Sequence, residues 1–280
     1  TRLNLMLNDD RILGGYLSRL FPMLIGLLIL NYNKISYKAL IFGMTLVIAT
    51  DLLVYMSGER TALGLLIISI ILLIMLLSKY KKIRLVTLVI SIIIIFIVSI
   101  NDENIKSRNI DHTLNQISGG NFEKKGSFTI DELIIFSSEH HSLYITSWRA
   151  FLDNPLTGLG PSTFRIICKN QKYAYNNKSC STHPHNTYMQ ILSELGLIGL
   201  MFILIILMYL AIIILKHIIS IKSNTANDRL SDYQICLIVT FILTLFPLLP
   251  TQNFFNNWIN VIYFLPIGFF LHSINTPHIK

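Results

Sequence analysis

Charged residues are scarce in this chain of 280 residues. They make up 14% of it, while apolar residues make up 52% and the mean hydropathy is +0.58. A typical soluble domain carries about 25% charged residues, so the composition argues against a soluble protein and favours a membrane protein. The formal charge of +8 is scattered among apolar segments rather than gathered in one stripe, and we therefore expect no nucleic-acid partner.

The short motifs of several enzyme classes are also absent. The chain has no phosphate-binding glycine loop, no GxSxG nucleophile turn and no HExxH zinc motif. It has no DxD pair either, and the adjacent acids Asp9 and Asp10 resemble a solvated edge before the first apolar run. These absences argue against metal-dependent glycosyl transfer, and we expect neither a metal nor another cofactor.

Cysteine is rare, with three residues in the whole chain. Cys168 and Cys180 share one polar segment, whereas Cys236 lies in an apolar run. A disulfide between the first two would contribute roughly 3 kcal/mol in an oxidising compartment. The alternative is two unpaired thiols. The spacing Cys-x11-Cys-x2-His-x-His matches no compact zinc motif.

Seven apolar runs alternate with polar connections. They cover residues 17–32, 37–56, 62–78, 83–100, 195–215, 234–249 and 258–273. Several approach the ~20 residues that a helix needs to cross a bilayer. The sequence therefore predicts an all-α, polytopic membrane bundle. Residues 1–100 contain four of the helices, and residues 186–280 contain three. Between them, residues 101–185 form a large outer segment with short helices.

The positions of Lys and Arg predict the orientation, because these residues concentrate in short cytoplasmic connections. Lys79, Lys81, Lys82 and Arg84 follow the third run and place that connection in the cytoplasm. Alternation then puts residues 101–185 outside. Thr1 would also lie outside, and because no initiator Met is present we expect further spans upstream.

The outer segment has two predicted helices. An amphipathic helix runs from Ser142 to Asp153 and ends before Asn154-Pro155, because Pro disfavours helix at the residue before it. A second helix begins near Pro184, a favoured residue for a first helical position, and continues into the membrane. Residues 101–141 are polar and predicted to be irregular.

Two arginines are candidates for binding phosphate at the outer membrane surface. Arg60 lies at the outer corner after the second run, and Arg149 lies in the amphipathic helix. A guanidinium can hold a pyrophosphate through parallel hydrogen bonds. Alternatively, Arg60 anchors the end of a helix at the membrane surface or pairs with Glu59. The alternative for Arg149 is an exposed side chain beside Trp148. Five basic residues and one acid lie from Arg149 to His185, which would attract an anion.

His185 is the candidate general base. In the first turn of a helix that begins near Pro184, the helix dipole would disfavour its protonation, and nearby backbone N–H groups could bind an anion. A neutral imidazole there suits proton transfer from a hydroxyl. The alternative is a structural histidine, and His183 is a partner or a spare. Asp51, within the second run, is functional or pairs with a nearby Arg.

Several of these residues lie in blocks that resemble the O-antigen ligase and O-antigen polymerase family of bacterial envelope polysaccharide enzymes. The blocks are Ser57-Gly58-Glu59-Arg60-Thr61-Ala62-Leu63, Trp148-Arg149, Asn154-Pro155-Leu156-Thr157-Gly158-Leu159-Gly160, and His185-Asn186-Thr187-Tyr188 continued to Glu194-Leu195-Gly196. The last block is the most specific.

The resemblance implies a multi-pass glycosyltransferase of the bacterial inner membrane, with its active site on the periplasmic face, in lipopolysaccharide biosynthesis. It implies a glycan donor linked to undecaprenyl pyrophosphate, a glycan or lipid A core acceptor, and neither metal nor nucleotide sugar. Residues like Arg60 and Arg149 would bind the pyrophosphate, and one like His185 would activate the acceptor. Asn186 and Glu194, in the same block, are supporting candidates. Family members usually have about ten to twelve spans, against seven here.

Three functions remain open at this point. A ligase, a polymerase and a protein O-glycosyltransferase differ only in their acceptor. A transporter or flippase would need charged or broken helices near the bilayer midplane, whereas the polar residues here gather in the outer segment. A structural membrane protein would not need the Arg and His residues. We expect the transferase, and a ligase first.

Overall fold

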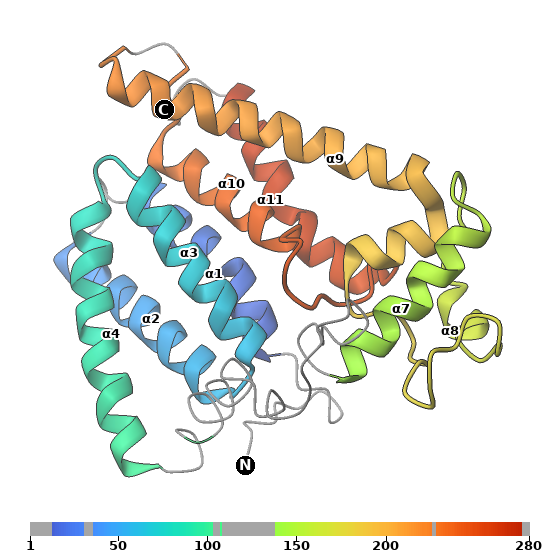
Figure 1. The fold of residues 1–280 in the computed structure, drawn as a ribbon. Helices are drawn as coiled ribbons and strands as arrows, with labels where there is room; N and C mark the ends of the chain where they lie inside the picture. The colour runs from blue at the N-terminus through green and yellow to red at the C-terminus, as the bar shows by residue number, and fades with distance from the viewer. Residues whose placement is uncertain (1–12, 31–35, 103–106, 108–137, 226–227, 276–280) are drawn as a thin grey trace, which may run out of the picture. The chain divides into compact units, whose positions relative to one another are not determined.

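The computed structural model describes residues 13–30, 36–102, 107, 138–225 and 228–275, and these ranges contain helices and no strand. The helices are α1 (Leu13–Leu30), α2 (Tyr37–Met56), α3 (Arg60–Leu76), α4 (Lys81–Asn101), α7 (Ser138–Asp153), α8 (Phe164–Ile167), α9 (Thr187–Lys222), α10 (Asp232–Thr244) and α11 (Asn257–Asn275) (Figure 1). The predicted all-α class is confirmed. The prediction for 101–141 falls largely outside the described residues.

Each of the seven apolar runs contains a helix. Four helices, α1, α2, α4 and α9, are long and apolar enough to cross a membrane, while α3, α10 and most of α11 form shorter apolar helices. The fold is therefore that of a polytopic helical membrane protein. Some boundaries differ from the prediction. Helix α10 ends at Thr244 rather than near 249, because Pro247 lies just beyond it. Helix α9 continues to Lys222.

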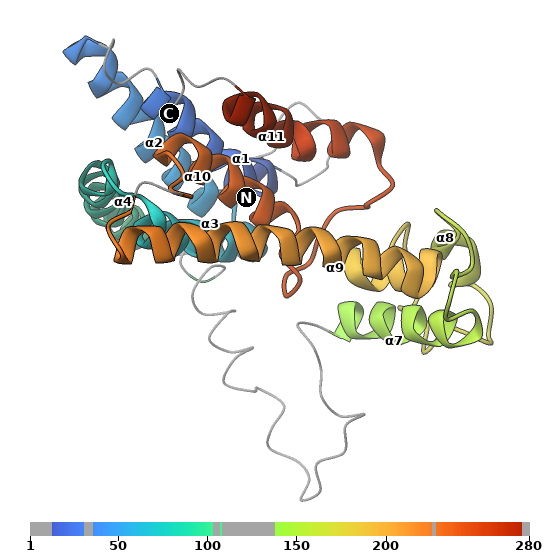
Figure 2. The same ribbon diagram turned by 90° about the horizontal axis from the view of Figure 1, so that it is seen from above.

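The chain divides into two compact units. The first comprises Thr1–Ser118, Ile213–Thr244 and Tyr263–Lys280, and the second comprises Gly119–Ile212 and Leu245–Ile262. In the first unit α10 packs against α1 and α3 (Figure 2). At its start, the Asp232 carboxylate accepts hydrogen bonds from the backbone N–H groups of Ser78, Lys79 and Tyr80, at 2.8–3.1 Å. The connection between α3 and α4 is thus fixed to α10.

A buried ion pair joins α2 to α4 in the first unit. Arg84 donates to both carboxylate oxygens of Asp51, at 2.8 and 3.1 Å, and Ser91 Oγ donates to the same group at 2.7 Å. Both charged side chains are 2% exposed. Asp51 therefore has the arginine partner that the sequence left open as its alternative role. Removing either charge would leave the other buried and unpaired.

The second unit contains α7, α8 and most of α9, as far as Ile212. Leu143 and Tyr144 of α7 pack with Phe164 and Cys168, and Met189 of α9 covers this cluster. Helix α7 ends at Asp153 as predicted, before Asn154-Pro155, although it begins at Ser138 rather than Ser142.

Candidate functional site

Helix α9 is broken at Gly196, and a loop fills the break. Gly196 has φ 66° and ψ −158°, so the backbone hydrogen bonds of the helix are interrupted there. The loop 155–160 supplies the missing partners. Leu159 N–H donates to Ser193 O at 3.0 Å and Gly160 N–H to Glu194 O at 2.9 Å, while Pro155 O accepts from Leu197 N–H at 2.8 Å.

Both glycines at this junction are required by close backbone approach. A Cβ at Gly196 would lie 2.5 Å from the carbonyl carbon and oxygen of Leu156. A Cβ at Gly158, which also has positive φ, would lie 2.3 Å from the carbonyl carbon of Glu194. The Asn-Pro-Leu-Thr-Gly-Leu-Gly block and the Glu-Leu-Gly block are therefore two halves of one interlock, which the sequence alone does not reveal.

Glu194 anchors the same loop with its side chain. Its carboxylate accepts hydrogen bonds from the backbone N–H groups of Ser162 (3.0 Å) and Phe164 (2.8 Å), and from Gln190 Nε2 (3.2 Å). The residue is fully buried. Gln190 also binds Asn253 and Phe254. Glu194 thus joins the turn before α8 to α9, a positioning role that leaves it no contact with solvent.

The segment from Cys180 to Asn186, which we call the histidine loop, is held at both ends. The structure joins Cys180 to Cys168 by a disulfide, with 4.9 Å between their Cα atoms. At the other end, Asn186 Oδ1 accepts the N–H groups of Tyr188 and Met189, and Asn186 Nδ2 donates to Pro247 O. Asn186 therefore caps α9.

This cap corrects the predicted start of α9. The helix begins at Thr187, so His185 precedes the capping residue and does not lie in the first turn as predicted. His185 has a left-handed backbone, with φ 56°, and its carbonyl accepts from Thr251 N–H at 2.9 Å. Non-glycine residues rarely adopt this conformation, and those that do are concentrated at functional sites.

The two histidines of this loop have different surroundings. His183 is buried, its Nε2 lies 3.3 Å from Thr251 O, and its Nδ1 lies 3.0 Å from Thr182 Oγ1. A carbonyl only accepts, so Nε2 carries the proton and both ring nitrogens are used. His185 is half-buried, and its Nε2 lies 3.3 Å from Ser181 Oγ. Of the two, His185 is the one open to an incoming hydroxyl.

Burial lowers the pKa of both imidazoles and so favours their neutral forms. Burial, together with the neighbouring His185, lowers the pKa of His183 to about 4. Burial and then the charge of His140 lower the pKa of His185 below its ordinary value. The rings of His140 and His185 lie 5.7 Å apart, edge to face, and those of His183 and His185 lie 4.1 Å apart. A neutral His185 at pH 7 can accept a proton.

Sequence reasoning missed His140. It lies in the first turn of α7, four residues before Tyr144, and so faces the same side of that helix. The predicted helix began only at Ser142, and His140 was therefore assigned to the irregular segment. A predicted helix that began a few residues earlier would have placed His140 and Tyr144 on one face, and this would have identified His140 as a candidate.

Arg149 is exposed on α7 and contacts the loop after α8. Its Nη1 donates to Ala174 O at 2.8 Å, and its guanidinium lies 5.6 Å from the centre of the Tyr175 ring. Nine residues separate it from His140, which places the two on opposite sides of α7 and roughly 13 Å apart along its axis. The structure thus separates Arg149 from the side of α7 that meets His185.

Arg60 is the first residue of α3 and is exposed, in the first unit. Beside it, the Glu59 carboxylate accepts the backbone N–H groups of Gly14 and Gly15, at 2.9 and 3.0 Å. Burial raises the pKa of Glu59 despite these bonds.

Sequence reasoning also missed Arg19, which is 3% exposed and lies 5.1 Å from the Tyr263 ring centre. A lone cation inside the first apolar run was the available signal.

No group of three or more His, Cys, Asp or Glu side chains in the described ranges is arranged to hold a metal ion. The fold and the site together define a polytopic helical membrane protein with a half-buried histidine on a disulfide-anchored loop.

The chain belongs to the O-antigen ligase family, whose family model matches residues 44–204, more than half of its length. The resemblance drawn from its motifs is confirmed. Membership supports a function of the O-antigen ligase or polymerase type in polysaccharide biosynthesis. Searches of curated proteins and of solved structures found no match.

Proposed function

We propose that this protein is an inner-membrane glycosyltransferase that moves a glycan from undecaprenyl pyrophosphate to a sugar hydroxyl of the lipid A core, on the periplasmic face. The observation that carries the proposal is the setting of His185. It is half-buried, burial lowers its pKa, and it is held in a left-handed conformation by a capped helix and by Thr251. A base that is fixed before the acceptor arrives needs little reorganisation during the reaction.

In the proposed reaction, the acceptor hydroxyl gives its proton to His185 and its oxygen bonds to the anomeric carbon of the donor glycan. The bond from that carbon to the pyrophosphate oxygen breaks, and its electron pair leaves with undecaprenyl pyrophosphate. General base catalysis of this kind contributes typically 10²–10⁴-fold in rate. Thr182 and Thr251 hold His183 in the loop, which makes it a positioning residue in this scheme.

Arg60 and Arg149 are each proposed to bind phosphate of the donor. Because Arg149 lies on the side of α7 away from His140, its proposed role is to hold the donor rather than to contact the bond that breaks. A guanidinium has five N–H donors. The bond from Arg149 to Ala174 O uses one of them, so others remain for phosphate oxygens. We propose that the reaction needs no metal, since a guanidinium group can bind the phosphate charge of the donor. Transfer by purified protein in excess EDTA is expected to keep its full rate.

Complementation tests the proposal. The full-length gene should restore O-antigen ladders in a ligase-deleted strain, and His185→Ala should abolish them at unchanged expression. His272→Ala is a matched control, because His272 is an exposed histidine in the last turn of α11. Failure of the wild-type gene, followed by rescue of a polymerase-deleted strain, would reassign the acceptor to a second repeat unit. Ladders that persist with His185→Ala would remove His185 from the mechanism.

A further inference from the structure

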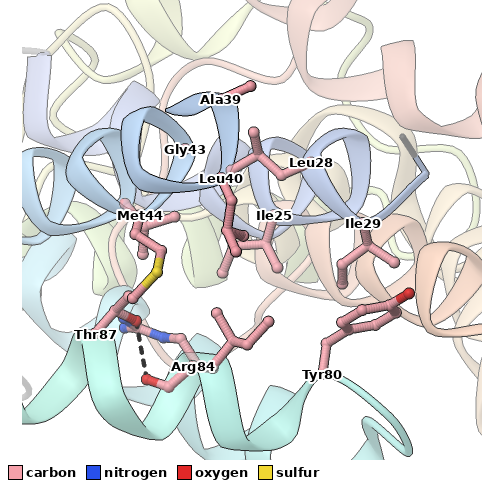
Figure 3. A pocket seen from close by; sticks show the side chains of 12 residues that line it. Ile25, Leu28, Ile29, Ala39, Leu40, Gly43, Met44, Tyr80, Arg84 and Thr87 are labelled. Carbon is pink, nitrogen blue, oxygen red and sulfur yellow. Dashed lines mark hydrogen bonds between the residues drawn. The ribbon is translucent and has the colours of Figure 1, made fainter. Parts of the chain in front are cut away.

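An apolar cavity of about 50 Å³ lies between α1, α2 and α4 of the first unit (Figure 3). Ile25 and Leu28 line it from α1, Leu40 and Met44 from α2, and Tyr80 and Ile83 from the start of α4. This volume is several times what one water molecule needs. Arg84 and Thr87 also line the cavity, but Arg84 is paired with Asp51 and Thr87 is bonded to Arg84, so the walls offer water few polar partners. All three helices have the length and composition to cross a membrane. A hydrocarbon chain therefore suits the cavity better than water does.

Basic side chains gather beside this cavity. Lys79, Lys81 and Lys82 are exposed and are neighbours in the sequence of Tyr80 and Ile83, which line its wall. They form a cluster of three positive charges within four residues, at the end of the cavity where α4 begins.

The backbone that carries these lysines is fixed. The Asp232 carboxylate accepts the N–H groups of Ser78, Lys79 and Tyr80, and Arg229 donates to Ser78 Oγ at 3.3 Å. Asp232 is buried and is occupied by backbone donors. Asp232 thus orders the backbone that carries the lysines, and their side chains remain exposed.

We propose that the cavity and the three lysines form a site for an anionic phospholipid. One acyl chain lies between α1, α2 and α4, and the phosphate headgroup lies on Lys79, Lys81 and Lys82. Basic patches beside a crevice between membrane helices recognise acidic headgroups on the cytoplasmic side. The same lysines predict that this corner faces the cytoplasm. The site is independent of His185 and of the transfer reaction.

The charge of each lysine near the membrane surface strengthens the binding of an anionic lipid roughly fivefold. Removing all three is therefore expected to weaken binding of phosphatidylglycerol roughly 100-fold. It should have little effect on phosphatidylethanolamine, which has no net charge. Filling the cavity should weaken the binding of both lipids, because both carry the same acyl chains.

Native mass spectrometry of the full-length protein, with either lipid added in detergent, measures both effects. Wild type should bind phosphatidylglycerol roughly 100-fold more tightly than phosphatidylethanolamine. The triple variant Lys79→Gln, Lys81→Gln, Lys82→Gln should lose this preference. The control Lys216→Gln, Lys222→Gln, at exposed lysines of α9, should keep it. Ala39→Trp, on the cavity wall, should weaken binding of both lipids.

Three kinds of result would overturn the proposal. The first concerns lipid preference: it is either equal affinity of the wild type for the two lipids or an undiminished preference in the triple variant. The second comes from photolabelling with phosphatidylglycerol that carries a reactive acyl chain. Labelling of neither Leu40 nor Met44 would mean that another part of the polypeptide fills the cavity. The third is displacement of phosphatidylglycerol by equimolar undecaprenyl phosphate, which would assign the site to a polyprenyl lipid.

Discussion

Gly196→Ala tests the interlock between the break in α9 and the loop 155–160. The new Cβ would lie 2.5 Å from the carbonyl carbon and oxygen of Leu156 and 2.6 Å from Thr157 N, so backbone atoms must move. The φ of 66° and ψ of −158° are accessible essentially to glycine alone, and another residue there costs about 1–3 kcal/mol. Displacing packed atoms adds typically 1–3 kcal/mol. We expect a total destabilisation on the order of 4 kcal/mol.

The assay is thermal unfolding of the purified full-length protein in detergent. A loss of this size should lower Tm by roughly 8–16 °C, given about 2–4 °C per kcal/mol for a chain of this length. Gly268→Ala is the matched control, because a Cβ there meets nothing within 4 Å, and Ala favours helix by about 1 kcal/mol. A Tm for Gly196→Ala within 2 °C of the Gly268→Ala value would refute the interlock.

Three further predictions concern the second unit. Because the pKa of His183 falls from 6.5 to about 4 on folding, the stability it contributes is present above pH 6.5 and is lost as the pH falls toward 4. This loss amounts to roughly 3 kcal/mol, and His183→Gln should flatten the fall in denaturation midpoint over that range. Reduction of the Cys168–Cys180 disulfide, or Cys168→Ser with Cys180→Ser, should cost roughly 3 kcal/mol; an unchanged Tm under reductant would contradict this. Arg149→Lys should weaken donor binding about tenfold through loss of paired hydrogen bonds, while Arg165→Lys, at an exposed arginine of α8, should not; equal effects would exclude Arg149 from the donor site.

Hydropathy predicted the membrane helices well, because burial in lipid imposes long apolar runs on the sequence. The end of α7 at Asp153 was equally accessible, since Asn154-Pro155 acts locally on the backbone. These features depend on neighbours in the sequence, and a single sequence therefore contains the information to find them.

Features that depend on distant partners were not accessible in this way. Pro184 and Asn186 are both reasonable helix starts, and Asn186 prevails because its side chain also reaches Pro247 O, 61 residues away. The role of Asp51 depends on Arg84, which lies 33 residues further along the chain. The sequence around Gly196 predicts a continuous helix. The break follows from the backbone of Leu156, which lies against Gly196 and is 40 residues away in the sequence.

The central claim is that His185 accepts the proton of the acceptor hydroxyl. Its most direct test is single-turnover transfer by purified full-length protein, from an undecaprenyl-pyrophosphate-linked glycan to a lipid A core acceptor. His185→Ala is expected to slow transfer by about 10²–10⁴-fold while donor affinity and Tm stay at the wild-type values. The wild-type rate should fall with decreasing pH as His185 becomes protonated. Transfer by His185→Ala at the wild-type rate, with the same pH profile, would contradict the account.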